Sequence, residues 1–235
     1  MHAIILAGGF GTRLRSAVSD VPKPLAPIAG RPFLAWFVDM LIGQGVTSVT
    51  LSVHHDWEKI RDYFTTHPVT IPLDYAVEET PLGTGGAIVY ALKKHAGKAP
   101  VIVLNGDSFI QVDVLALYAQ HQKNNAKFTM VLRSVSDAGR YGNVEEQDGI
   151  ITSFSEGVAG KSGLINAGVY VLNKEIFNEK LPDAFSFERD FLPPRLKTLK
   201  AQSFRADNYF IDIGIPEDYA RACKELPEMI ALAGK

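Results

Sequence analysis

Residues 3–14 read AIILAGGFGTRL, a short apolar run that passes directly into a loop with three glycines. The apolar run from 3 to 7 predicts a buried β-strand. Gly8, Gly9 and Gly11 carry no Cβ, so backbone N–H groups of this loop can point inward at an anion. A glycine-rich turn after a strand is often only a turn, so the argument for an anion site depends on the charged residues that follow.

Two cationic side chains follow this loop. Arg13 supplies a planar guanidinium that suits phosphate oxygens, and Lys23 stands between Pro22 and Pro24, which stiffen the backbone around its charge. Two common phosphate motifs are excluded. The Gly-x-Gly frame has Leu14 where a dinucleotide-binding loop needs a small residue, and no Gly-Lys-Ser/Thr forms a P-loop. The segment therefore predicts a phosphate cradle of another kind.

Outward from this loop, short apolar runs alternate with amphipathic stretches, which is typical of parallel strands joined by crossover helices. The expected strands cover 3–7, 48–53, 73–77, 101–104, 128–133, 142–146, 150–154 and 164–172, and the expected helices cover 33–44, 57–64, 84–95 and 113–124. The closer spacing of strands after residue 127 indicates hairpins. The fold class is α/β, with a mixed, mostly parallel sheet flanked by helices in one domain over 1–235.

Two aspartates stand at the ends of apolar runs. Asp107 follows the strand expected at 101–104, and Asp212 ends the run 209–211 just before a helix that begins at Pro216. The carboxyl ends of strands are where open α/β sheets place ligand groups, and Mg²⁺ needs only one or two carboxylates besides substrate phosphates. We predict Asp107 and Asp212 as magnesium ligands. The alternative, that Asp212 only caps a turn, stays open.

Composition favours small-molecule partners. The chain has 235 residues, 46% apolar side chains, a net charge of −2 and no run of Lys or Arg, so nucleic-acid and membrane-surface binding have little support. Cys223 is the single cysteine and forms no internal disulfide. No leader or 18-residue apolar run is evident, so we expect a soluble, cytoplasmic monomer or homodimer.

The pattern GGxGTRL followed by Pro-Lys-Pro resembles the N-terminal signature of the sugar-1-phosphate nucleotidyltransferases, a family with a Rossmann-like fold. The resemblance implies that Arg13 and the glycine loop hold a nucleoside triphosphate, while Lys23 bridges the nucleotide and sugar phosphates in the transition state. It assigns the nucleotide to the half at about 1–110 and the sugar to the half at about 111–235. The implied loop residues are Leu6, Ala7, Gly8, Gly9, Gly11 and Thr12.

Base recognition is expected in the segment 78–86, which reads EETPLGTGG and joins a strand to a helix N-terminus. The resemblance places the base beside Gly83 and Thr84. The carboxylate of Glu79 could accept both N1–H and N2–H₂ of guanine, and it would repel the carbonyls of uracil, so it favours GTP. An exposed, solvated Glu79 is the alternative.

Sugar recognition is expected in the second half. Segments around Gly142, Glu156 and Asn166 resemble those with which the family binds sugar hydroxyls, and Asn105 joins this set. Many relatives have a lysine directly after the glutamate, to neutralise the sugar phosphate, whereas Gly157 follows Glu156 here. We predict that Lys161 replaces that lysine.

Within the family, the chain most resembles guanylyltransferases of a manno-heptose 1-phosphate, which implies transfer of GMP from GTP to D-glycero-α-D-manno-heptose 1-phosphate with release of pyrophosphate. Two alternatives stay open: a uridylyltransferase of N-acetylmuramate 1-phosphate and a guanylyltransferase of mannose 1-phosphate. From another class, a non-catalytic regulatory subunit would bind nucleotide sugars. Four costly charged groups, Arg13, Lys23, Asp107 and Asp212, argue against it.

Overall fold

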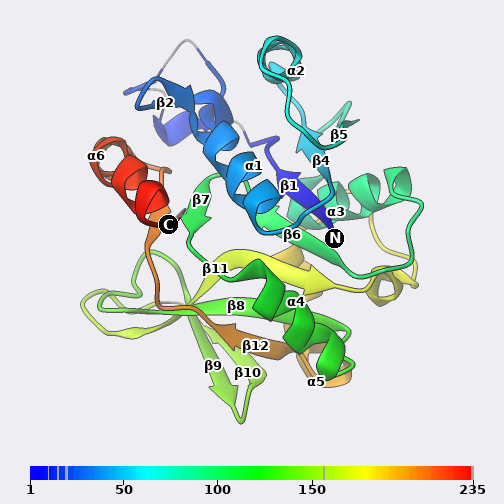
Figure 1. Cartoon of the computed structure of the whole chain (residues 1–235). Helices are drawn as coiled ribbons and strands as arrows, with labels where there is room; N and C mark the ends of the chain where they lie inside the picture. The colour runs from blue at the N-terminus through cyan, green and yellow to red at the C-terminus, as the bar shows by residue number, and fades with distance from the viewer. Residues whose placement is uncertain (10, 15, 19–20, 156, 234–235) are drawn as a thin grey trace.

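The computed structural model describes residues 1–9, 11–14, 16–18, 21–155 and 157–233 (Figure 1). In chain order the strands are β1 (His2–Leu6), β2 (Pro27–Ile28), β3 (Arg31–Pro32), β4 (Ser48–Val53), β5 (Leu73–Val77), β6 (Val101–Asn105), β7 (Ser108–Ile110), β8 (Phe128–Val135), β9 (Asn143–Gln147), β10 (Ile150–Ser155), β11 (Gly163–Leu172), β12 (Gln202–Arg205) and β13 (Phe210–Asp212). The α-helices are α1 (Phe33–Gly43), α2 (Trp57–Thr66), α3 (Gly83–Lys94), α4 (Val114–Lys123), α5 (Leu196–Leu199) and α6 (Pro216–Ala233).

Across the described ranges, one nine-stranded sheet runs through both halves of the chain in the order β5-β4-β1-β6-β11-β8-β12-β10-β9. The strands β5, β4, β1 and β6 are parallel to one another, and β8 and β12 form a further parallel pair. The remaining neighbours are antiparallel, including the hairpin of β9 and β10. The predicted α/β class with a mixed sheet is confirmed, and parallel order prevails in its first half.

Helices cover both faces of this sheet, because its central strands carry apolar side chains on each side. On one face, side chains of α1, α4 and α6 pack together, as Phe37, Leu117 and Ala222 illustrate. On the other face, α3 and α5 contribute Ile88 and Leu196. Figure 1 shows α4 in front of the sheet, with α3 and α5 behind it.

Local sequence signals explain the helix starts. Asp113 caps α4 by accepting a hydrogen bond from the backbone N–H of Ala116 at 2.8 Å, as its position before the apolar stretch predicts. Pro216 begins α6, also as expected. Among the helices of the described residues, none is both long and apolar enough to cross a membrane.

A buried histidine in β1 predicts a pH-dependent stability. His2 is 7% exposed, and its Nδ1 lies 2.8 Å from Ser48 Oγ. Burial, the nearby His95 and the N-terminal ammonium together lower the pKa of His2 to about 4, and burial is the largest of the three causes. In the unfolded chain this pKa is about 6.5, so between about pH 6.5 and 4 the unfolded state binds more protons. Stability is therefore lost as the pH falls through this window.

We expect this contribution to be about 1 to 2 kcal/mol, below the full value of the shift, because the nearby N-terminal ammonium is exposed to water. Urea unfolding at pH 7 and pH 4.5 measures it. His2→Gln, which does not titrate, is expected to reduce the pH dependence, and His67→Gln, at an exposed position, serves as the control. An unchanged pH dependence in His2→Gln would contradict this assignment.

Candidate active site

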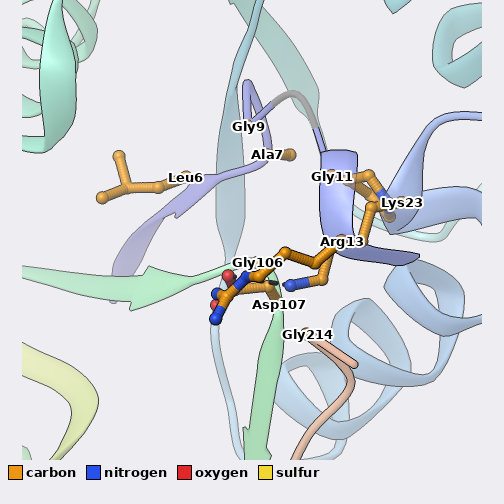
Figure 2. A pocket seen from close by; sticks show the side chains of 10 residues that line it. Leu6, Ala7, Gly9, Gly11, Arg13, Lys23, Gly106, Asp107 and Gly214 are labelled. Carbon is orange, nitrogen blue, oxygen red and sulfur yellow. Dashed lines mark hydrogen bonds and ion pairs between the residues drawn. The ribbon is translucent and has the colours of Figure 1, made fainter. Parts of the chain in front are cut away.

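The loop after β1 forms one wall of a hollow of about 210 Å³. Figure 2 shows the side chains of Arg13 and Lys23 reaching toward Asp107 across this hollow. Two short 3₁₀ turns carry these cations, at Thr12–Leu14 and Lys23–Leu25. The lining residues are Leu6, Ala7, Gly9, Gly11, Arg13, Lys23, Pro24, Gly106, Asp107 and Gly214. The structure thus brings the predicted phosphate loop, both predicted cations and one predicted metal ligand together.

Asp107 is held beside this loop by the parallel pairing of β6 with β1. Leu6 is in register with Asn105, and the N–H of Gly106 donates to the carbonyl of Leu6 at 2.9 Å. A Cβ at Gly106 would lie 2.6 Å from that carbonyl oxygen, so glycine is required for the close approach. The chain therefore turns tightly out of β6 and presents Asp107 to the phosphate hollow.

Asp212 reaches the same place through a short antiparallel pair that we did not predict from the sequence. In this pair β13 lies against β7, with Asp212 opposite Ser108. The N–H of Ile213 donates to the carbonyl of Asp107 at 3.0 Å, and the N–H of Gly214 donates to Asp212 Oδ1 at 2.7 Å. Two aspartates that are distant in the sequence thereby become neighbours.

Lys23 lies between these two carboxylates. Its Nζ is 3.0 Å from Asp107 Oδ2 and 3.9 Å from Asp212 Oδ1, and its side chain is only 9% exposed. Burial raises the pKa of Asp212, the charge of Asp107 raises it further, and Lys23 and Arg140 oppose the rise. The site therefore gathers negative charge that a cation stabilises.

The donor set at this point fits a hard divalent cation. Mg²⁺ takes oxygen ligands and uses one or two carboxylates together with substrate phosphates. Asp107 and Asp212 provide two carboxylates next to a hollow that is lined by a phosphate-binding type of loop. In the part of the chain that the structure describes, no cluster of three or more His, Cys, Asp or Glu forms a metal cage.

A second hollow of about 320 Å³ adjoins the first and shares Leu6, Gly9 and Asp107 with it. Gly83 and Thr84, at the start of α3, line it as expected for a nucleotide site. The remaining lining residues are Gly8, Glu78, Pro81, Ala87 and Asn105.

The glutamate that lines this second hollow is Glu78, whereas the sequence prediction named Glu79. Glu79 is exposed and lines a different hollow, with Thr80 and Leu82. Glu78 is 8% exposed, and its two oxygens accept from Ser52 Oγ at 2.9 Å and from the N–H of Leu82 at 3.1 Å. Side chains alternate along β5, whose Ala76 is buried, so extending that alternation would have pointed to Glu78.

Two of the predicted sugar-binding residues, Asn105 and Asn166, carry amide side chains. Asn105 lies beside Gly168, and its Oδ1 is buried without a hydrogen-bond partner among the described residues. Asn166 donates to the hydroxyl of Tyr170 at 2.7 Å and accepts from the N–H of Gly168 at 2.9 Å, so its amide orientation is set. Both amides therefore lie next to Gly168.

Gly142, with a φ of 75°, leads into β9. Lys161 is exposed and lines neither hollow, and its carbonyl accepts from the N–H of Ala138 at 2.9 Å. Glu156 lies outside the described residues. The structure therefore brings Asn105 to the second hollow and leaves the predicted role of Lys161 without a supporting contact.

A glycine loop, two cations and a pair of carboxylates at strand ends form a site for phosphate chemistry on a nucleotide. The family model described as Nucleotidyl transferase matches residues 2–228. The chain belongs to this nucleotidyl transferase family.

Two curated relatives with nearly the same length are D-glycero-alpha-D-manno-heptose 1-phosphate guanylyltransferases. The protein of Campylobacter jejuni is 47% identical, over 93% of this chain and 97% of its own length. The protein of Aneurinibacillus thermoaerophilus is 43% identical, over 98% of this chain and 100% of its own length. The mannose-1-phosphate guanyltransferase of Schizosaccharomyces pombe is 32% identical, and the match covers 68% of that protein.

Solved structures agree with this family. The crystal structure of HddC from Yersinia pseudotuberculosis matches with a TM-score of 0.86 at 38% identity, covering 96% of this chain and 99% of that one. A structure of the same protein complexed with GMP-PN matches with a TM-score of 0.84 at 37% identity.

Proposed function

We propose that this protein transfers GMP from GTP to D-glycero-α-D-manno-heptose 1-phosphate and releases pyrophosphate, giving GDP-heptose. The observation that carries the proposal is the placement of Lys23 between Asp107 and Asp212 at the phosphate hollow, because nucleotidyl transfer brings two anions together at one point. The choice of heptose and guanine rests on the two full-length relatives at 47% and 43% identity.

In the reaction, a phosphate oxygen of the sugar 1-phosphate attacks the α-phosphorus of GTP. The bond from that phosphorus to the oxygen bridging the α- and β-phosphates breaks, and pyrophosphate leaves with the electron pair. Arg13 and the backbone N–H groups of the glycine loop bind the β- and γ-phosphates. Lys23 stabilises the negative charge that accumulates on the transferring group.

Magnesium is the cofactor of this proposal, with Asp107 and Asp212 as its protein ligands. When bound, it would neutralise phosphate oxygens and orient the triphosphate for in-line attack. Lys23 is positioned to help hold both carboxylates in place, since its Nζ contacts each of them.

The two halves of the chain divide the substrates between them. We assign GTP to the half at about 1–110, where both hollows lie against the loop after β1. We assign the sugar to the half at about 111–235, which supplies Gly142 and Asn166, with Asn105 at the boundary. The buried Oδ1 of Asn105 is an acceptor for a sugar hydroxyl.

Within the proposed guanine site, Glu78 takes the role that the sequence prediction gave to Glu79. Each carboxylate oxygen has two acceptor positions, and each oxygen of Glu78 uses one of them for Ser52 or Leu82. The remaining positions can accept N1–H and N2–H₂ of guanine. Uracil offers one N–H between two carbonyls, which this carboxylate would repel.

Glu78→Gln is therefore expected to weaken the preference for GTP over UTP by about tenfold to a hundredfold in kcat/KM, since a lost hydrogen bond to a charged group costs about 1.5 to 3 kcal/mol. Glu79→Gln is the matched neighbouring variant and should leave the preference unchanged. The measurement is kcat/KM for both nucleotides at a fixed sugar phosphate. If only Glu79→Gln changes the preference, the sequence prediction is right and the assignment to Glu78 is wrong.

Pyrophosphate release separates this enzyme from a non-catalytic nucleotide-sugar-binding subunit. We expect release from GTP to require both the heptose 1-phosphate and magnesium, and to stop when EDTA is added. Binding of GTP without any release would support the regulatory alternative.

A further inference from the structure

The phosphate of a sugar 1-phosphate carries its own negative charge, and the first half of the chain already uses Arg13 and Lys23 for the nucleotide. A second anion that approaches the same point needs a further cation. We therefore expect a cation from the second half of the chain near Asp212.

Two consecutive residues of the second half contact residues that precede and follow Asp212 in the sequence. The ring of Tyr141 packs edge-on against Phe210, with 5.7 Å between the ring centroids. Arg140 Nη1 lies 2.7 Å from Asp218 Oδ2, in the first turn of α6. Phe210 lies two residues before Asp212 and Asp218 six residues after it, so the segment 140–141 lies near the end of β13 that carries Asp212.

The loop that carries Arg140 is held by hydrogen bonds against the segment that connects β10 to β11. Asp137 accepts hydrogen bonds from the N–H groups of Gly139 and Gly160, at 2.9 and 3.0 Å. A Cβ at Gly157 would lie 1.9 Å from the carbonyl oxygen of Ala138, so no side chain fits at that position. The tight contact leaves position 157 without a charge and directs the loop toward α6.

Arg221 shares Asp218 with Arg140, with its Nη1 3.4 Å from Asp218 Oδ1. Two further cations of the second half make other contacts. Arg133 lies over the ring of Phe210, 5.8 Å from its centroid, and its Nη1 is buried. That Nη1 has no hydrogen-bond partner among the described residues, and burial lowers the pKa of Arg133 while the charge of Asp207 opposes this. Lys161 is exposed outside both hollows. Arg140 is 47% exposed. Its guanidinium has five N–H donors, and the hydrogen bond to Asp218 occupies only one of its nitrogens, so other donors remain for a ligand.

We propose that Arg140 binds the phosphate of the sugar 1-phosphate substrate. This inference rests on the proposed function. Lys23 serves the transferring phosphate of the nucleotide and Arg140 serves the phosphate of the sugar, so each of the two reacting phosphates has a cation of its own. Asp218 holds the guanidinium in place, and it also fixes the start of α6 next to Asp212.

The test is the set of steady-state constants for both substrates in Arg140→Ala and Arg140→Lys. Arg140→Ala is expected to raise KM for the heptose 1-phosphate by about tenfold to a hundredfold, the loss expected for hydrogen bonds to a charged group, while KM for GTP stays within about twofold. Arg140→Lys keeps the charge without the planar fork and should show a smaller rise. Melting temperatures check that each variant is folded.

Arg205→Ala is the matched control, because its pairing is the same in kind. Arg205 is 45% exposed and pairs at 2.6 Å with Glu146, whose side chain is 16% exposed. Arg140 is 47% exposed and pairs at 2.7 Å with Asp218, whose side chain is 10% exposed. This control should leave both KM values unchanged.

Asp218→Asn tests whether Arg140 acts by binding substrate or only by supporting α6. This variant removes the ion pair between Arg140 and Asp218 and keeps the guanidinium of Arg140. We expect a rise in KM for the sugar phosphate of less than about threefold. The inference is overturned if Asp218→Asn matches the effect of Arg140→Ala, if Arg140→Ala raises KM for GTP instead, or if Lys161→Ala gives the larger effect. A wild type that releases no pyrophosphate with any sugar 1-phosphate overturns the proposed function as well.

Discussion

Asp107→Asn is expected to remove most of the turnover and leave the fold intact. The amide keeps the shape of the side chain and loses the charge that would hold magnesium. Lys23 retains a carboxylate partner, because its Nζ also lies 3.9 Å from Asp212. By analogy with the removal of one transition-state hydrogen-bond donor, the loss should be at least about 2 to 3 kcal/mol, or roughly 30- to 150-fold in kcat.

The measurement is kcat as a function of magnesium concentration, with the melting temperature as a check on the fold. Asp74→Asn, at an exposed position of β5, is the control and should behave like the wild type. A near-wild-type kcat at saturating magnesium in Asp107→Asn would show that this carboxylate is no metal ligand.

The second large effect is expected from Lys23→Ala. The ammonium group is almost fully buried and lies against both carboxylates, so it acts in a place where water screens little. If its contact strengthens as charge develops on the transferring phosphoryl group, its removal lowers kcat more than it raises KM for GTP. We expect a fall in kcat of about a hundredfold to a thousandfold.

Lys23→Arg should rescue poorly, because the flanking Pro22 and Pro24 fix the backbone and the larger guanidinium needs another geometry. Steady-state constants for all three proteins decide the matter. A Lys23→Ala variant that changes only KM would make Lys23 a ground-state binding residue and contradict the role proposed for it.

Local patterns in the sequence predicted most of the fold. The bounds expected for β4 and β5 agree with the structure, because a period of two and flanking turn residues define them. The sequence patterns did not predict the strand β12. It has only four residues, and its partner β8 is remote in the sequence. Short strands of this kind depend on tertiary pairing, which a local pattern does not contain.

The candidate site was predictable where its functional residues directly follow a strand in the sequence. Asp107 and the loop after β1 occupy the expected places because parallel strands end at a common edge. That Asp212 lies beside Asp107 depends on the pairing of β13 with β7, which no local signal reveals. Glu78, which lines the second hollow, and the predicted Glu79 differ by one position, and in an extended segment such a shift exchanges the two faces.

The most direct test of the proposed function is a matrix of GTP, UTP, ATP and CTP against three sugar 1-phosphates, scored by magnesium-dependent pyrophosphate release. The sugars are D-glycero-α-D-manno-heptose 1-phosphate, mannose 1-phosphate and N-acetylmuramate 1-phosphate. We predict the highest kcat/KM for GTP with the heptose 1-phosphate. A preference for UTP with N-acetylmuramate 1-phosphate, a higher kcat/KM with mannose 1-phosphate, or no release with any pair would contradict it.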